Sequence, residues 1–303
     1  MIAARLPAML IRAAALLVAA AFAVAAPAHP GRSVVGPESE RGAAAALVES
    51  AQAAFRLGTE LLTADPAASR RQFEESAAGF EQAIALVGET PGLLLNLGNA
   101  NLKAGRLGPA ILALRNARLL DPSDARIALS LDRARALQRD RIAAEPEGVW
   151  GQLLAAAIAP PPALRQTALI LVNVCFWGLL ALRLVRPVPL ALIIVLGVAT
   201  LAGAATILLD RLEARPGRHA VLMVDNAVLR RGSGESFAPA ITERPSQGLE
   251  LRVVALRPGW VQVRLPDGAE GWMRDDQVAP VGGGFDPLAA PGVPLPKRES
   301  GAG

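Results

Sequence analysis

The sequence is short of the residues that most often build chemical sites. Its 303 residues include one cysteine, Cys175, two histidines, His29 and His219, and no tyrosine. A single cysteine excludes a disulfide within the chain. One cysteine and two histidines also exclude the metal sites that are built from clusters of these two residue types. We therefore expect neither a metal nor another cofactor.

Positive charge is present but never concentrated. Almost all the cations are arginines, since Lys103 and Lys297 are the only lysines, and the formal net charge is +4. The chain has no run of five like charges and no basic stretch interleaved with aromatic residues. Nucleic-acid binding needs such a patch, so nucleic acid is not an expected partner.

The motifs of common enzymes are missing too. The chain contains no GxSxG, no HExxH, no phosphate-binding loop and no Cys–His pair in a polar segment. His219 is a single histidine near a domain edge, and carboxylates such as Glu74, Glu75 and Glu81 fall on predicted helix surfaces. We expect a protein without catalytic residues, one that is not an enzyme.

Apolar residues are abundant, at 52% of the chain with a mean hydropathy of +0.35. Residues 166–182 and 187–209 contain no charge, and each run has the length of a helix that crosses a bilayer. We predict two transmembrane helices over these ranges; the alternative is a buried hairpin in a soluble protein. The four-residue turn Arg183–Arg186 forces a helical hairpin, so both flanking segments lie on the same side of the membrane.

The N-terminus has the pattern of an export signal. Arg5 and Arg12 precede the uninterrupted apolar stretch Ala13–Ala26, and small residues follow. We predict a signal peptide over residues 1–28. Export would place both domains outside the cytoplasm and the two-arginine turn inside, in agreement with the positive-inside tendency. Residues 143–165 are predicted to link the first domain to the membrane along its interface.

Residues 43–142 have apolar residues at helical spacing. The 34-residue unit Pro91–Asp124 matches the offsets of a tetratricopeptide repeat at Leu94, Leu97, Gly98, Ala110, Leu114, Ala117 and Pro122. Gly98 and Ala110 are small because the two helices of the unit would cross closely there. A plain helical hairpin is the alternative.

A weaker copy of the unit precedes it and one helix follows. The copy runs from Leu57-Gly58 to Leu86 and is about six residues too long for the repeat, which predicts an insertion within residues 64–71. Residues 123–142 predict a final helix that caps the array. The apolar face of that helix comprises Ile127, Leu131, Ala134 and Leu137.

The first helix of the central unit supplies the candidate protein-binding residues. They are Asn96, Asn99, Leu102 and Lys103, on the face that a solenoid of this kind turns inward. Asparagine amides both donate and accept hydrogen bonds, so they can hold a peptide backbone without reading its sequence. Alternatively, Asn96 and Asn99 only bridge neighbouring turns.

In residues 216–281 the apolar residues recur at every second position instead of at helical spacing. Strands are predicted over 249–256, 261–265 and 271–273, with a hairpin turn at Pro266–Gly268. Residues 220–229 predict a further strand pair that turns at Asp225-Asn226. So many short strands indicate a small barrel. Trp260 and Trp272 either pack in its core or rim or form a ligand-binding platform. The Gly- and Pro-rich residues 282–303 are predicted to be a disordered tail.

The order of these parts resembles the BatE proteins of bacterial aerotolerance operons. In the helical region the resemblance rests on Leu95–Ala100, Lys103, Gly105, Gly108, Ala110-Ile111 and Leu120–Asp124. In the barrel it rests on Gly248, Trp260–Val263, Asp267-Gly268 and Gly271-Trp272, which look like the bacterial SH3 pattern. The complete absence of tyrosine departs from that family.

The resemblance implies a multidomain fold with an all-α tetratricopeptide solenoid, a transmembrane helical hairpin and a small all-β SH3-like barrel. It implies no catalysis, but a scaffold in the bacterial inner membrane with both domains facing the periplasm. The implied partners are von Willebrand-type membrane proteins and a MoxR-type ATPase, in an envelope-stress or aerotolerance complex. The alternative is a membrane protein that binds peptidoglycan through the SH3-like domain.

Overall fold

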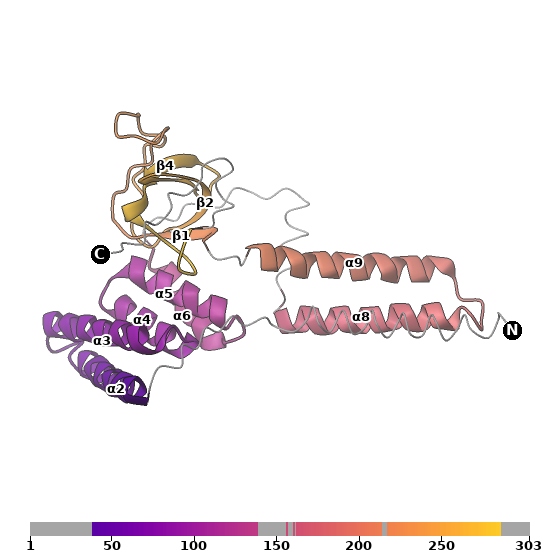
Figure 1. Cartoon of the computed structure of the whole chain (residues 1–303), viewed down its shortest axis with the longest axis horizontal. Coiled ribbons are helices and arrows are strands. Elements are labelled where there is room, and N and C mark those ends of the chain that lie inside the picture. Colours follow the sequence, from indigo (N-terminus) through magenta and orange to yellow (C-terminus); the bar gives the residue numbers. More distant parts are fainter. Residues whose placement is uncertain (1–37, 139–155, 157–159, 161, 214–216, 286–303) are drawn as a thin grey trace, which may run out of the picture. The chain divides into compact units, whose positions relative to one another are not determined.

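The computed structural model describes residues 38–138, 156, 160, 162–213 and 217–285. These residues fall into two compact units. One unit contains a pair of apolar helices, and the other contains a helical region and a small β domain (Figure 1). The predicted signal peptide, most of the predicted linker 143–165 and residues 286–303 of the predicted tail lie outside the described residues.

The helical region consists of five consecutive helices, and each packs against the next. They are α2 (Glu38–Glu60), α3 (Pro66–Val87), α4 (Pro91–Lys103), α5 (Leu107–Leu120) and α6 (Ala125–Ala136). The last helix, α6, contacts α4 as well as α5. Two helical hairpins and a closing helix therefore stack side by side, as Figure 1 shows in indigo to magenta.

Local capping fixes where these helices begin. The side chains of Asp65, Thr90 and Asp124 accept hydrogen bonds from the backbone N–H groups of Ala68, Leu93 and Arg126. Proline follows the first two caps directly, in the position where its missing N–H costs nothing. The turn between α4 and α5 needs Gly105, whose φ is +79°.

Glycine lets the paired helices cross closely. A Cβ on Gly98 would lie 2.6 Å from Cγ of Leu114 on α5, and one on Gly79 would lie 2.9 Å from Cβ of Ala51 on α2. Gly58 packs in the same way against the ring of Phe73. The expectation that Gly98 is small because of a close crossing is confirmed.

Two predicted details of the helical region are wrong. Residues 64–71 hold no insertion: α3 starts at Pro66, and the extra length comes from α2 and α3, which are 23 and 22 residues long against 13 and 14 for α4 and α5. The final helix is shorter than expected because it ends at Ala136. Leu137 follows the helix with 62% of its surface exposed, while Ile127, Leu131 and Ala134 are fully buried.

The second unit contains two long apolar helices, α8 (Pro162–Leu182) and α9 (Leu190–Glu213). Both are long and apolar enough to cross a membrane, over Leu164–Leu182 and Leu190–Leu208. The second starts later than predicted because Pro187 and Pro189 occupy the connection. The helices pack against each other where Gly197 and Gly203 of α9 meet Phe176 and Leu169 of α8.

The β domain is one antiparallel sheet of five short strands. They are β1 (His219–Leu222), β2 (Glu250–Arg257), β3 (Trp260–Arg264), β4 (Glu270–Arg274) and β5 (Val278–Pro280), in the order β4-β3-β2-β1-β5. The inward side chains, among them Leu251, Val261, Val263 and Met273, form a buried core. The predicted hairpin at Pro266–Gly268 is confirmed as the β3–β4 turn.

The predicted strand pair over residues 220–229 is wrong. Only residues 219–222 form a strand, and β1 pairs with β2 and β5 rather than with the residues that follow it. The turn at Asp225-Asn226 exists, with Asn226 at a φ of +56°, but it starts a long connection to β2. In that connection Arg230 pairs with Trp272 at the outer edge of β4. Strand β5, with three residues, is too short to show the alternation of buried and exposed residues from which a strand is predicted.

The close crossing of α4 and α5 gives a stability prediction. Gly98→Ala should lower the free energy of unfolding by about 1–2 kcal/mol, because overpacking against Leu114 outweighs the smaller helix-propensity gain. Gly92→Ala, in the same helix with no atom within 4 Å of the new Cβ, should be neutral or slightly stabilising. Chemical unfolding of the full chain in detergent, followed by circular dichroism, measures both; equal effects would contradict the prediction.

Candidate functional site

The candidate binding residues of α4 lie on more than one side of the helix. Asn96, Asn99 and Lys103 follow one another at helical spacing; the asparagines are half-buried and Lys103 is exposed. Leu102 instead packs against the buried cluster of the helical region. Within the described part of the chain, neither the Asn96 nor the Asn99 side chain makes a hydrogen bond. Their amides are therefore available to a ligand.

A third asparagine of α4 has a structural role. Asn101 is buried, and its side chain donates to the backbone carbonyl of Leu97 one turn earlier. It thereby takes up space between α4 and its neighbours that an apolar or aromatic side chain would otherwise fill. Asn101 is therefore distinct from the open face at Asn96 and Asn99.

Trp260 and Trp272 lie on the outer face of the sheet. Trp272 stands opposite Gln262 and Trp260 opposite Arg274, whereas the neighbouring pair Val261 and Met273 points into the core. Trp272 is 9% exposed, and the guanidinium of Arg257 covers its ring at 4.8 Å from the centroid. Trp260 is half-buried and leaves part of this face accessible.

The helical region and the β domain share one hydrophobic contact. Val221 of β1 and Val281, just after β5, are buried in the same cluster as Ile111, Ile127 and Leu131 of the helices. Side chains from both ends of the β domain thus complete the core of the helical region. Because this cluster excludes water from both partners, it stabilises their association.

Two glycines bring the backbones together at this contact. Gly248, with a φ of +91°, lies so close to α5 that a Cβ would be 2.8 Å from Cγ of Leu107. From the other side, a Cβ on Gly108 would be 2.9 Å from the carbonyl oxygen of Leu222. Neither position has room for a side chain, so the contact is specific to these two glycines.

An ion-pair cluster lies beside the two glycines. The Glu250 carboxylate accepts hydrogen bonds from Nε and Nη2 of Arg135 at 2.7 and 3.0 Å, and Nε of Arg115 lies 3.5 Å away. Burial, the largest single effect, acts to raise the pKa of Glu250, but the two arginines, with a smaller contribution from His219, outweigh it and lower that pKa. The carboxylate is therefore charged at neutral pH and binds both helices to β2.

Further hydrogen bonds complete the contact. The Gln138 side chain donates to the carbonyl of Gly248 at 2.6 Å, and the Asn116 side chain accepts from the backbone N–H of Gly282 at 2.9 Å. The predicted disordered tail, residues 282–303, thus begins with a residue that is bound to α5. Phe285 also packs partly against the β-domain core.

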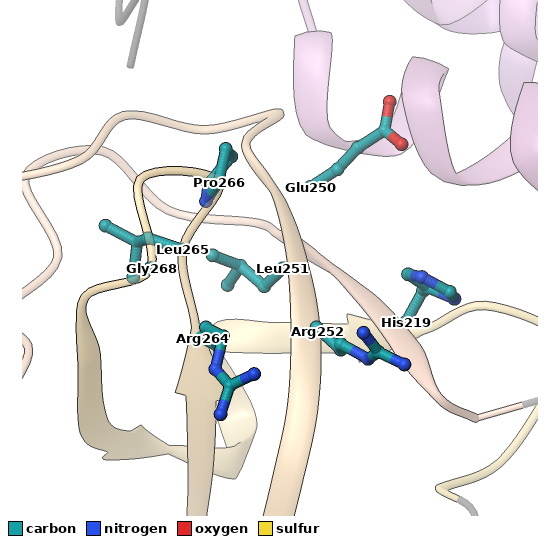
Figure 2. Close-up of a pocket in the computed structure, with 8 residues that line it drawn as sticks. All are labelled: His219, Glu250, Leu251, Arg252, Arg264, Leu265, Pro266 and Gly268. Carbon is teal, nitrogen blue, oxygen red and sulfur yellow. The ribbon is translucent and has the colours of Figure 1, made fainter. Parts of the chain in front are cut away.

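A shallow pocket opens on the sheet next to this contact (Figure 2). Residues of β1, β2, β3 and the β3–β4 turn line it: His219, Glu250, Leu251, Arg252, Arg264, Leu265, Pro266 and Gly268. In Figure 2 the Glu250 carboxylate points to the helices, whereas His219 and Arg252 lie next to each other. Among the residues that the structure describes, no group of three His, Cys, Asp or Glu side chains could hold a metal ion.

Comparison with protein-family models, with curated proteins and with solved structures finds no match to this chain. The structure thus supplies the strongest guide to function. It adds residues that the sequence did not single out, above all Arg115, Arg135 and Glu250. Nothing in the sequence distinguishes Glu250 from other carboxylates at strand ends, or Arg115 and Arg135 from the other arginines of α5 and α6.

The ion-pair cluster gives a prediction about stability and pH. At neutral pH, Glu250→Gln should lower the free energy of unfolding by about 2 kcal/mol, below the 3–5 kcal/mol of a fully buried pair. The pKa of Glu250 lies below its ordinary value of 4.5 in the folded chain. Its contribution is therefore complete above pH 4.5 and disappears as the pH falls through the lowered pKa.

Chemical unfolding of the full chain in detergent, repeated from pH 7 to pH 3, measures this difference. Glu270→Gln is the matched control, because Glu270 pairs with Arg264 at the surface of the sheet and should contribute less than about 1 kcal/mol. A Glu250→Gln effect that stays constant down to pH 3 would contradict the prediction.

Proposed function

We propose that this chain is a non-catalytic scaffold in the bacterial inner membrane, with a tetratricopeptide-like helical domain and an SH3-like β domain as its interaction modules. Both modules would face the periplasm and take part in a BatE-type envelope-stress or aerotolerance complex. The proposal joins the order of elements in the structure to the resemblance in the sequence.

The observation that supports the proposal most strongly is the exposure of the apolar helices α8 and α9. The most apolar window of α8 has none of its residues buried within the structure, and that of α9 has 6%. Core helices of a soluble protein would be covered, whereas these helices present side chains such as Leu171, Val195 and Leu201 outward. Lipid is the environment in which such a pair is stable.

Polar groups within the pair support the same conclusion. The hydroxyls of Thr200 and Thr206 donate to the backbone carbonyls of Leu196 and Gly203 in their own helix. Such internal bonds leave neither of these two hydroxyls with a donor that water must satisfy, which suits hydrocarbon surroundings. The connection between the helices contains Arg183 and Arg186, two charged groups that need water, as expected for a turn at a membrane surface.

The helical region supports an interaction role through its shape and its open polar face. The hairpin α4–α5, with Gly98 at its crossing, has the size and the small residue expected of a tetratricopeptide unit, and α6 contacts both of its helices. The amides of Asn96 and Asn99 stay available on the first helix of that unit. A protein segment is the ligand that such amides suit best.

The β domain supports the SH3-like part of the proposal through its five short antiparallel strands and the long connection between β1 and β2. Its attachment at Glu250 and Gly248 fixes it to the helical region, so a partner would meet the two modules as one body. The partner classes, von Willebrand-type membrane proteins and a MoxR-type ATPase, follow from the resemblance alone.

Membrane insertion is the first point to test. The full chain should stay with the membrane fraction after an alkaline carbonate wash, and a variant that lacks residues 162–213 should be released. A reporter that is active only in the periplasm, fused after Val281, should be active. Release of the intact chain by carbonate, or a reporter active only in the cytosol, would sink the proposal.

Binding by α4 is the second point. The triple variant Asn96→Ala, Asn99→Ala and Lys103→Ala should reduce capture of a co-expressed von Willebrand-type membrane partner about tenfold or more, since each hot-spot residue contributes about 1 kcal/mol or more. The matched control, Glu81→Ala with Gln82→Ala, changes exposed residues of α3 and should leave capture unchanged.

Equal capture by the triple variant and the control would refute the role of α4. If the chain instead binds peptidoglycan, the detergent-solubilised full chain should sediment with murein sacculi. Sedimentation that Trp260→Ala abolishes and the α4 variant does not would favour peptidoglycan binding through the β domain.

A further inference from the structure

A polar side chain, Asn173, lies at the centre of helix α8. It is nine positions from both Leu164 and Leu182, the ends of the apolar stretch that is long enough to cross a membrane. At 1.5 Å per residue, about 14 Å separate Asn173 from either end. The short asparagine side chain cannot extend over that distance to water at a membrane surface. The argument from here on rests on the proposed membrane insertion of α8 and α9.

The Asn173 amide makes no hydrogen bond within the part of the chain that the structure describes. By contrast, the hydroxyls of Thr200 and Thr206 in the neighbouring helix donate to carbonyls in the preceding turn of α9. An amide that stays unbonded in hydrocarbon is unfavourable, because no water is present there to replace the missing partner. A polar group from another chain would remove this cost.

The packing of α8 on α9 leaves Asn173 partly open. Leu169 and Phe176, four positions before it and three after it, each pack against a glycine of α9. Asn173 itself is only half-buried. Ile170 and Trp177 lie beside it, farther round the helix from the contact with α9, and are half-buried as well. This edge of α8 thus presents an amide between two large apolar side chains.

We propose that α8 pairs with α8 of a second copy of this chain, and that the two Asn173 amides hydrogen-bond to each other. A primary amide contains both a donor and an acceptor, so two copies of it complement each other through two reciprocal bonds. Hydrogen bonds between polar side chains of this kind hold membrane helices together. Ile170 and Trp177 would pack around the bonded amides.

The depth of Asn173 favours a second copy over a different protein. Copies that insert in the same orientation are related by a twofold axis along the membrane normal, so Asn173 lies at one depth in both. A helix of another protein would need a polar group that happens to lie at this same depth. The proposed scaffold would then present each of its interaction modules twice.

Sedimentation equilibrium of the full chain in a density-matched neutral detergent tests the inference. The unchanged chain should form a reversible dimer. Asn173→Leu should weaken the dimer about tenfold, as expected when a hydrogen-bonded pair between membrane helices is lost, and Asn173→Gln should keep most of the affinity. The matched control is Cys175→Leu, which changes an exposed residue at nearly the same depth on another side of α8 and should leave the dimer unchanged.

Oxidative cross-linking in membranes shows which side of α8 forms the contact. In a Cys175→Ala background, Ile170→Cys should form a disulfide between two copies when copper phenanthroline is added, and adding Asn173→Leu should remove most of it. Leu171→Cys, at an exposed position on the far side of α8 from Asn173, should form little. Equal cross-linking at the two cysteines, or a dimer that Asn173→Leu does not weaken, would overturn the inference.

The outcomes also separate this inference from the proposed function. If the chain resists the carbonate wash but stays monomeric at every concentration, the α8 pairing is wrong and the membrane scaffold stands. A monomer that loses a co-expressed membrane partner when Asn173 is changed to leucine would likewise overturn the pairing, because Asn173 would then bind a different protein. If carbonate releases the intact chain, membrane insertion is wrong and the pairing fails with it.

Discussion

The contact between the helical region and the β domain is the interaction on which the arrangement of this protein depends. It joins an apolar cluster, in which Val221 and Val281 complete the helical core, to a carboxylate that two arginines hold. The apolar part supplies most of the stabilisation because it removes carbon surface from water. The ion pair makes the contact specific to one orientation, because Glu250 reaches both arginines only when β2 lies correctly against α5 and α6.

This contact would also help to stabilise the helical region if it is the repeat array that we propose. Two hairpins and one further helix are fewer than the three or more repeats that such arrays usually need, and terminal units usually carry a polar outer face. Here the β domain covers α5 instead, through Gly108 and Gly248. One side of the helical region is thus covered by a domain of a different kind.

Much of the local structure was predictable because it depends on neighbouring residues. Helices α4 and α5, the hairpin after β3 and the two apolar helices follow from caps, turns and runs that lie within a few positions of one another. The extra length around residues 64–71 was misread because a repeat pattern fixes spacing but cannot distinguish a longer helix from an inserted loop. Leu137 was misplaced because periodicity continues past the point where a helix ends.

The contact between the domains was not predictable in the same way. Arg135 and Glu250 are 115 residues apart, and nothing near either residue in the sequence indicates its partner. β1 was paired with the wrong residues for a related reason: its true neighbours, β2 and β5, lie 28 or more positions away, whereas a hairpin is the nearest solution that a local pattern offers. For the candidate sites, the sequence indicated the asparagines of α4, whereas only the structure brings Glu250 to Arg115 and Arg135.

The places where the chain enters and leaves this unit have a mechanical consequence. The segment towards α8 departs after Gln138, which is bonded to Gly248, and the segment from α9 arrives just before β1, which packs on α5. A force applied to α8 and α9 would therefore reach the contact between the helical region and the β domain before it reached the interior of either.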